Sequence, residues 1–423
     1  MLSRKNFDIE KNIKRQGQAR TTIWIIVGLL AVFSVPLVLS AYWKELIDHP
    51  NIGSWSGILW KQIAIVFLGM GVMWIGSIIP YKEWFPKITT ALMVIILLLL
   101  ATAFVQGAVK GLRIESWRSV YVTKAIRFQP SDFAKIVLIL YIAKEISVAI
   151  KEGSIKSLKV FLRILIPTLL MCGMIFIPNM STAGLIFIIA FVMMLVGGIR
   201  TKYLVITSLI TIVVVGGLLA VAAPAPTANA RVSRNIVTKN IVKIHDRLFA
   251  EGKAAQADIA KAAIANSPKG VGNGIFKKKL PEAHNDFVFA VICEEYSIWV
   301  GIFICFLYLN LIFLATFIWW RTSGNFYSLL VLGILVMLVA QTLIHLLYNV
   351  GIFPTTGQAM PLLSKGGTSF VMWCLCFGIM LRVSKAANKP EDEATIPEGS
   401  EKIEIASKNN MPEGQLDNKI KEP

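Results

Sequence analysis

Residues 203–222 read YLVITSLITIVVVGGLLAVA and contain no charged side chain. Residues 95–103, IILLLLATA, are apolar in the same way. An uninterrupted apolar stretch of this kind is longer than an ordinary buried core helix. It matches the roughly 30 Å hydrocarbon core of a bilayer, which takes about 20 helical residues to cross. The sequence therefore predicts that residues 203–222 form a membrane-spanning helix.

The composition extends this prediction to the whole chain. Of the 423 residues, 55% are hydrophobic and 16% are charged, and the mean hydropathy is +0.65. A soluble protein carries roughly 25% charged residues, so a soluble fold is disfavoured. The cysteines all lie in apolar stretches, which indicates buried small side chains rather than a disulfide framework or a zinc site. They are Cys172, Cys293, Cys305, Cys374 and Cys376.

We expect an all-α polytopic membrane protein with about ten transmembrane helices. One large extracytoplasmic loop, about residues 224–285, separates spans 7 and 8. The eighth span is long enough to be tilted or to begin outside the membrane. The expected spans are residues 22–42, 56–79, 89–107, 131–149, 159–177, 181–198, 203–223, 286–319, 326–350 and 367–384.

Basic residues set the expected orientation and the domain limits. Lysine and arginine recur in the N-terminal segment and in alternate short loops, which places both termini in the cytoplasm. We predict a basic cytoplasmic N-terminal segment (1–21), a transmembrane domain (22–385) and a disordered cytoplasmic tail (386–423). No small-residue cleavage site follows the first apolar stretch, so we expect that stretch to be a signal anchor.

The large loop is itself basic, and Arg231, Arg234 and Lys279 are among its cations. Such residues on the outer side suit a site for phosphate or pyrophosphate groups, although a merely solvated surface explains them as well. Nucleic acid is excluded as a partner outside the membrane, despite the net charge of +18. The apolar spacing over residues 237–248 predicts an amphipathic helix, lying either on the membrane surface or on the protein's own outer face.

Ionisable groups at the edges of spans are costly to bury, and this makes them functional candidates. Asp132 and Lys135 are three residues apart at the start of the fourth span and can pair on one helix face, for structure or for chemistry. Asp286 starts the eighth span at the water–lipid boundary, where a carboxyl group can have the raised pKa that suits a general base. A helix-start role for Asp286 is equally open. His284 has no second histidine at ligand spacing and is interpreted as a structural or substrate-orienting group.

Two further segments interrupt the apolar pattern. Residues 349–369 are rich in glycine and proline and predict a broken, re-entrant connection, which is tolerated only inside protein or along a cavity. Residues 268–274 form a glycine-rich loop, which alone is a weak indication of a phosphate site. No P-loop, dinucleotide-binding fingerprint or G-x-S-x-G elbow occurs, which argues against a nucleotide cofactor, an ATP-driven pump and a serine hydrolase.

Together, these segments resemble the SEDS family (FtsW, RodA and SpoVE) over roughly residues 20–385. Residues 129–135 (QPSDFAK) are similar to the family's QPSE-F-x-K, and residues 280–287 (LPEAHNDF) to its LPE-x-HTDF. A glycine-rich loop, the Glu294–Glu295 pair and the P-x-TG-x-x-LP-x-x-S-x-GG-[ST]-S pattern follow the same order. The sequence departs from the family at Asn179, where an acid is usual, and also at Asp132, Asn285, Met360 and Lys365.

The resemblance implies polymerisation of lipid II outside the cytoplasmic membrane, with Asp286 at the position of the family's essential aspartate. Asp286 would deprotonate the 4-hydroxyl of the acceptor GlcNAc, which attacks C1 of the donor MurNAc with inversion and expels undecaprenyl pyrophosphate. Arg231, Arg234 and Lys279 would stabilise the leaving pyrophosphate, and the sequence leaves open whether a divalent cation, Mg²⁺ or Mn²⁺, assists. The other substrate-binding candidates are Lys135, His284, Glu294, Ser364 and Ser369.

The basic N-terminal extension and the charged C-terminal tail favour the cell-division branch of the family over the elongation branch. The implied location is the division septum in the bacterial cytoplasmic membrane. The implied partners are a class B penicillin-binding transpeptidase of the FtsI type and other divisome membrane proteins. A lipid II flippase is an alternative, but no inverted repeat is evident between the two halves. A structural scaffold is another, and it would tolerate the loss of Asp286.

Overall fold

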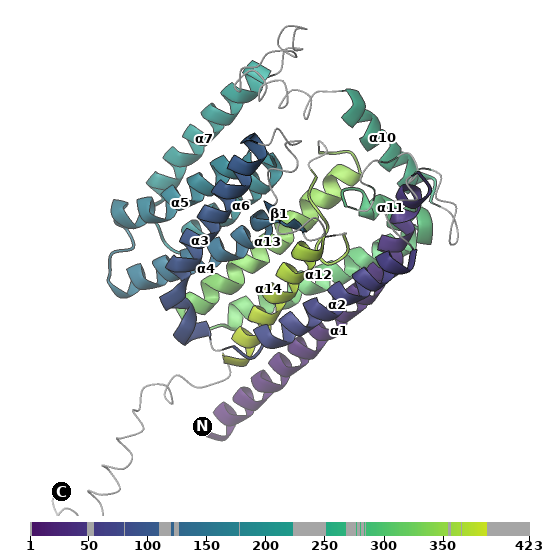
Figure 1. The fold of residues 1–423 in the computed structure, drawn as a ribbon. Coiled ribbons are helices and arrows are strands. Elements are labelled where there is room, and N and C mark those ends of the chain that lie inside the picture. Colours follow the sequence, from purple (N-terminus) through teal and green to yellow (C-terminus); the bar gives the residue numbers. More distant parts are fainter. Residues whose placement is uncertain are drawn as a thin grey trace, which may run out of the picture.

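The computed structural model consists almost entirely of helices (Figure 1). It describes residues 2–48, 55–79, 81–109, 120–121, 127–176, 178–222, 251–267, 285–353, 357–364 and 366–386, and the single positions 276, 280 and 283. The helices in these residues are α1 (Leu2–Asp48), α2 (Trp55–Gly76), α3 (Tyr81–Val109), α4 (Pro130–Lys151), α5 (Leu158–Phe176), α6 (Met180–Val196), α7 (Thr201–Ala222), α10 (Glu251–Ala265), α11 (Val288–Tyr296), α12 (Ile298–Arg321), α13 (Asn325–Asn349) and α14 (Gly367–Ala386). Strands β1 (Val120–Tyr121) and β2 (Arg127–Phe128) form an antiparallel pair just before α4.

Eight helices of the described chain are long and apolar enough to cross a membrane: α1, α2, α3, α5, α7, α12, α13 and α14. The protein is therefore a multi-pass membrane protein. The expected spans at residues 131–149 and 181–198 correspond to α4 and α6, which are not among these eight helices. Helix α6 has only 17 residues, and α4 carries Asp132, Lys135, Lys144 and Glu145 along its length. Both pack against α13 inside the bundle, so neighbouring helices cover their polar groups.

The expected eighth span, residues 286–319, was wrong as a single element. The chain breaks at Ser297 into the short helix α11 and the long helix α12. Ser297 has φ 116° and ψ 153°, which no helical residue adopts, and its side chain accepts a hydrogen bond from Trp299 N at 3.4 Å. Gly301 in the first turn of α12 faces Cys293 of α11, where a β-carbon would lie 2.6 Å from Sγ. The missing side chain lets the two helices pack closely at the break.

Small residues also bring α2 and α14 close together. Gly69 of α2 lies against the ring of Phe370, and Gly378 of α14 lies against the backbone of α2, where a β-carbon would be 2.6 Å from the carbonyl oxygen of Met73. Without a hydrophobic drive between helices in lipid, such close packing supplies much of the attraction. Helix α14 is consequently buried along most of its length.

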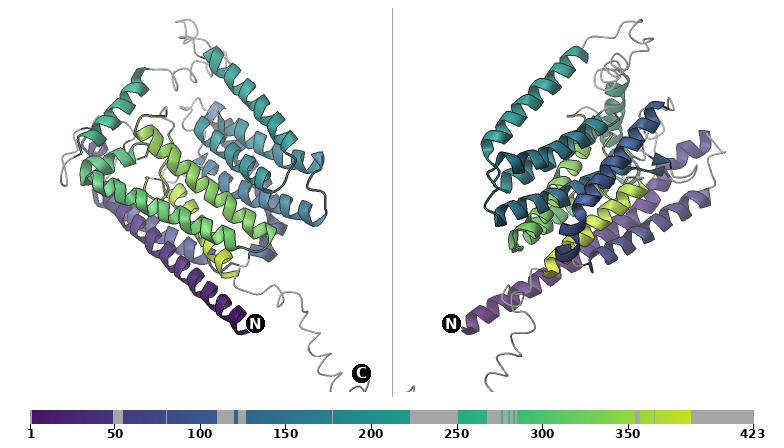
Figure 2. Two further views of the ribbon diagram at one scale, coloured as in Figure 1. Left: turned by 180° about the vertical axis from the view of Figure 1, so that it is seen from behind. Right: turned by 60° about the vertical axis from the view of Figure 1, so that its left-hand side comes forward.

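Helices α7 and α10 lie at the margin of the bundle (Figure 2). Helix α7 contacts α6 and leaves nearly all of its apolar side chains on the surface, as expected for a helix surrounded by lipid. Helix α10 packs on α11 and α13, and its Ala260 and Ala263 are fully buried. The amphipathic helix predicted over residues 237–248, the tail at 387–423 and most of the large loop lie outside the described residues.

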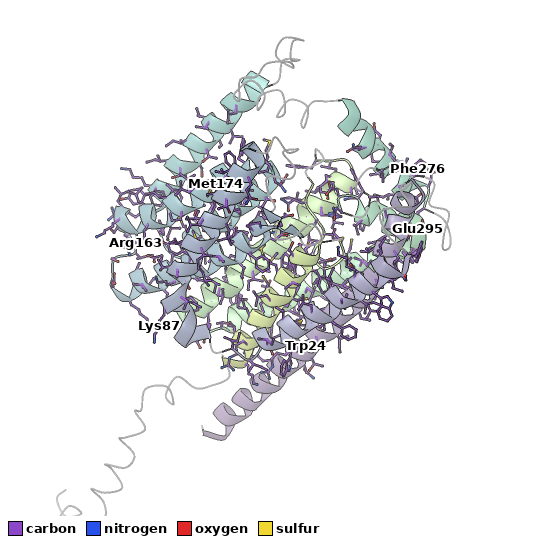
Figure 3. All side chains as sticks on the ribbon, viewed as in Figure 1. Trp24, Lys87, Arg163, Met174, Phe276 and Glu295 are labelled. Carbon is purple, nitrogen blue, oxygen red and sulfur yellow. The ribbon has the colours of Figure 1, made fainter. Side chains whose placement is uncertain are left out.

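The bundle has two distinct ends. Helix α1 begins and α14 ends on one side, while α10 and α11 lie on the other (Figure 1). Figure 3 shows Phe276 and Glu295 beside α10 and α11, far from Lys87 and Arg163. Asp286 directly precedes α11, so we call this side the Asp286 end.

Candidate active site

Asp286 is half-buried, and its backbone is held by the last residue of α13. The side-chain amide of Asn349 donates from Nδ2 to the carbonyl oxygen of Asp286 at 3.2 Å and to that of His345 at 2.8 Å. Its Oδ1 accepts from Ala290 N at 3.2 Å, in the first turn of α11, where backbone N–H groups lack helical partners. One buried amide therefore fixes the start of α11 and the Asp286 backbone to α13.

A second segment, residues 357–364, lies against Asp286 from the other side. Gly357 has φ +69°, and a β-carbon there would be 3.3 Å from Asp286 Oδ2. Ser364 Oγ donates to the carbonyl oxygen of Asn285 at 2.9 Å and accepts from Met360 N at 2.7 Å. The structure thus brings Ser364 and Asp286, which are predicted site residues, to the same junction.

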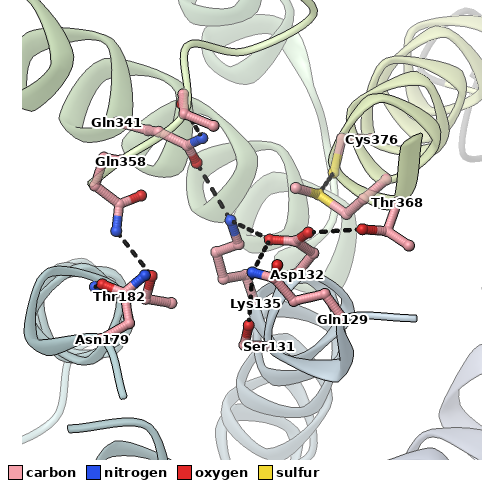
Figure 4. A network of polar contacts seen from close by, with 12 residues as sticks. Gln129, Ser131, Asp132, Lys135, Asn179, Thr182, Gln341, Gln358, Thr368 and Cys376 are labelled. Carbon is pink, nitrogen blue, oxygen red and sulfur yellow. Dashed lines mark hydrogen bonds and ion pairs between the residues drawn. The ribbon is translucent and has the colours of Figure 1, made fainter. Parts of the chain in front are cut away.

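Lys135 lies beneath this segment in a buried polar network (Figure 4). Its Nζ is 3.6 Å from Asp132 Oδ1 and donates to Gln341 Oε1 at 3.4 Å, and its side chain is 2% exposed. Thr368 of α14 donates to Asp132 Oδ2 at 3.0 Å, and Gln341 Nε2 donates to the carbonyl oxygen of Ala359 at 2.7 Å. The pair predicted from sequence therefore exists and joins α4, α13 and α14 to the segment beside Asp286.

The start of α6 contacts the same segment. Gln358 Nε2 donates to Thr182 Oγ1 at 2.8 Å, and Thr182 N donates to Asn179 Oδ1 at 3.1 Å (Figure 4). Asn179 is the N-cap of α6, a role that requires only a side-chain oxygen acceptor. The residue that replaces the family's acid is thus used structurally, and an amide serves as well as a carboxylate.

The other predicted site residues are distributed as follows. Glu294, which is 3% exposed, accepts from Phe276 N at 2.6 Å and so ties Phe276 to α11. Ser369 is buried in the first turn of α14, next to Thr368 of the Lys135 network. The four remaining candidates, Arg231, Arg234, Lys279 and His284, lie outside the described residues.

Sequence reasoning missed several polar residues of α13. His345, Tyr348 and Gln341 are at most 1% exposed and all bond to the 357–364 segment. The rule that ionisable groups within spans are functional candidates would have flagged His345. Lys261 of α10 is a further cation at the Asp286 end: it packs on Gly351 and pairs with Asp258 at 3.4 Å.

A divalent cation finds no ready site in the described part of the chain. No three His, Cys, Asp or Glu side chains come together there in a group that could hold a metal ion. The prediction of Mg²⁺ or Mn²⁺ stays a prediction.

Comparison with known proteins shows a match to one protein family over most of the chain. The model of the FtsW, RodA and SpoVE family, described as "Cell cycle protein", matches residues 20–389. The chain is 27% identical over 407 residues to the probable peptidoglycan glycosyltransferase FtsW of Bacillus subtilis (strain 168), covering 90% of this chain and 94% of that protein. It is also 27% identical over 381 residues to stage V sporulation protein E of the same organism, covering 86% and 95%.

Solved structures have the same fold. A chain of a peptidoglycan synthase complex, studied for the coordination of polymerization and crosslinking, superposes with a TM-score of 0.61 at 22% identity, covering 85% of this chain and 98% of that chain. The rod shape determining protein RodA of Thermus thermophilus gives a TM-score of 0.56 at 20% identity, covering 86% and 97%.

Proposed function

This chain belongs to the FtsW, RodA and SpoVE family of cell cycle proteins, and from that membership we propose that it is a peptidoglycan glycosyltransferase that polymerises lipid II. The observation that carries the proposal is the setting of Asp286. The residue is half-buried, its backbone is fixed by Asn349, and the nearby Gly357 has no side chain to crowd the carboxylate. A partly buried carboxylate at a fixed backbone position suits a general base.

In the proposed reaction, Asp286 accepts the proton of the 4-hydroxyl of the acceptor GlcNAc. The resulting oxygen attacks C1 of the donor MurNAc from the side opposite the leaving group, and the new glycosidic bond forms as the bond from C1 to the phosphate oxygen breaks. Undecaprenyl pyrophosphate leaves with that electron pair. General base catalysis contributes about 10²–10⁴-fold, so positioning and charge stabilisation must supply the rest.

Cations at the Asp286 end would stabilise the leaving pyrophosphate. Lys261, whose side chain is half-exposed on α10, is a described candidate for this role. Arg231, Arg234 and Lys279 belong to the same large loop and remain candidates by sequence. We expect these groups to face the extracytoplasmic side, with both termini in the cytoplasm.

The proposed setting is septal wall synthesis beside a class B penicillin-binding transpeptidase. Two observations support this assignment. The relatives include proteins named FtsW, and the fold matches a chain of a peptidoglycan synthase complex in which polymerization and crosslinking are coordinated. A lipid-facing groove of the bundle would receive the single span of the transpeptidase.

The decisive experiment compares the wild type with Asp286→Asn in a lipid II polymerisation assay, with the cognate transpeptidase present. Glu152→Gln, which removes an exposed carboxylate directly after α4, is the matched control. We expect polymer from the wild type and the control, and a loss of at least about 100-fold in Asp286→Asn. Wild-type rates in Asp286→Asn would exclude Asp286 as the base. No polymer from any variant, together with lipid II scrambling in liposomes, would favour a transporter.

A further inference from the structure

Two side chains of α13 hold one backbone carbonyl of the 357–364 segment. Tyr348 OH donates to the carbonyl oxygen of Gln358 at 2.6 Å, and His345 Nδ1 lies 2.8 Å from the same oxygen and 2.8 Å from the Tyr348 hydroxyl. Both aromatic residues are completely buried and Gln358 is 3% exposed. A carbonyl oxygen accepts two hydrogen bonds, so this group is fully satisfied when Nδ1 carries the imidazole proton.

Tyr348 also contacts the chain segment that contains Asp286. Its ring packs edge-on against Phe287, the residue after Asp286, with 6.0 Å between ring centroids. Gln358, which its hydroxyl holds, directly follows Gly357, the residue whose backbone approaches the Asp286 carboxylate. Tyr348 therefore connects both chain segments that meet at Asp286, and the next residue, Asn349, binds the Asp286 carbonyl.

His345 uses only one of its nitrogens for this contact. Nδ1 faces Gln358, whereas Nε2 is buried and has no hydrogen-bond partner among the described residues. An asparagine side chain can place an N–H group close to the position of Nδ1 but has no counterpart of Nε2. The two nitrogens can therefore be distinguished by substitution.

We propose that Tyr348 and His345 are positioning residues for glycosyl transfer. By holding the Gln358 carbonyl they keep Gly357 against the Asp286 carboxylate, and they do so from within the bundle rather than by contact with substrate. If the carbonyl lost its buried donors, the segment would have to move to find others. A displacement of about 1 Å at a reacting group lowers turnover by roughly 100-fold. The kinetic part of this inference rests on the proposed function, while the structural part does not.

Four variants separate positioning from general stability. Tyr348→Phe removes the hydroxyl and keeps the ring against Phe287. His345→Leu removes Nδ1, and His345→Asn retains a donor in its place. The matched control is Tyr141→Phe, because Tyr141 also donates to a backbone carbonyl, that of Arg163 at 3.2 Å, further along α4 and away from Asp286.

Two measurements are made on each variant: lipid II turnover with its KM, and hydrogen exchange of the amides of residues 357–364. We expect Tyr348→Phe and His345→Leu to lower kcat by about 10- to 100-fold at an unchanged KM. Their segment amides should exchange at least about tenfold faster than in the wild type. His345→Asn and Tyr141→Phe should match the wild type in both measurements.

Wild-type turnover in Tyr348→Phe and His345→Leu would overturn the inference, and so would an equal loss in Tyr141→Phe. If Asp286→Asn alone abolished polymerisation, the proposed function would stand and the positioning role would fall. If the wild type made no polymer, the proposed function would fail. Hydrogen exchange alone would then test whether Tyr348 and His345 hold the 357–364 segment in place. Unchanged exchange in both variants would show that these residues do not hold the segment.

Discussion

At the scale of single residues, Gly357 sets the space around Asp286. Its φ of +69° lies in the left-handed region that glycine occupies without cost. A β-carbon would be 3.3 Å from Asp286 Oδ2, tighter than an ordinary van der Waals contact, so a side chain here would press on the carboxylate. Two requirements, one of backbone conformation and one of space beside the carboxylate, therefore meet at this position.

The substitution Gly357→Ala tests which requirement dominates. Gly153→Ala is the control, because Gly153 has φ +67° between α4 and α5 and its β-carbon would meet nothing within 4 Å. We expect both variants to lose about 1–2 kcal/mol of stability to the left-handed backbone. Polymerisation should fall at least about tenfold in Gly357→Ala and stay at the wild-type rate in Gly153→Ala. Equal rates in both would show that space beside the Asp286 carboxylate is unimportant.

At the scale of elements, the break between α11 and α12 is held together by α10. Ser267, which follows α10, donates from Oγ to the carbonyl oxygen of Cys293 and accepts from Ile298 N, both at 2.8 Å. One hydroxyl thus bridges the two helices across Ser297. The backbone of Ser297 lies in a region that is essentially restricted to glycine and costs other residues about 1–3 kcal/mol.

Ser297→Gly is expected to stabilise the protein by about 1 kcal/mol. The relief of strain outweighs the loss of the weak 3.4 Å cap to Trp299 N, which is worth a few tenths of a kcal/mol when glycine replaces serine at this position. Ser147→Gly, within α4, should instead destabilise by about 0.5–1 kcal/mol. Thermal unfolding in detergent measures both. A lower midpoint for Ser297→Gly would mean that the cap matters more than the strain.

At the scale of the whole molecule, the Asp132–Lys135 ion pair links helices α4, α13 and α14 to the 357–364 segment. Its ammonium and carboxylate are buried where the effective dielectric is low, so each group depends on the other. Through Gln341 and Thr368 the pair reaches α13 and α14. The same hydrogen-bond network therefore joins the packed interior of the bundle to the 357–364 segment, which lies beside Asp286.

A double-mutant cycle measures the strength of that coupling. Lys135→Met alone leaves a buried carboxylate without its cation and should cost about 3–5 kcal/mol, whereas Asp132→Asn combined with Lys135→Met should recover most of this loss. The same cycle on the exposed Asp258–Lys261 pair should give no more than about 1 kcal/mol. Strictly additive losses at Asp132 and Lys135 would mean that the pair carries no coupling.

Much of the architecture follows from local sequence, since apolar stretches locate the helices and polar residues at their edges point to Asp286 and Ser364. The break at Ser297 could not be predicted, because residues that form helices continue on both sides of it and no glycine or proline stands at the break. The bond from Gln358 to Thr182 joins residues 176 positions apart, and no local pattern encodes such a contact. The rule for ionisable groups within spans points to His345, but no local pattern encodes the contact of His345 or of Tyr348 with the Gln358 carbonyl.

Helix α1 has a mechanical consequence. Its 47 residues correspond to a rod of about 70 Å, more than twice the roughly 30 Å hydrocarbon thickness, and its apolar span covers only Arg15–Ser40. Helix α1 packs on α11 and α12 as well as on α2 and α14. The first turns of α1 project beyond its apolar span, so a force applied there would be transmitted along the helix, past Pro36, to α11, the helix that follows Asp286.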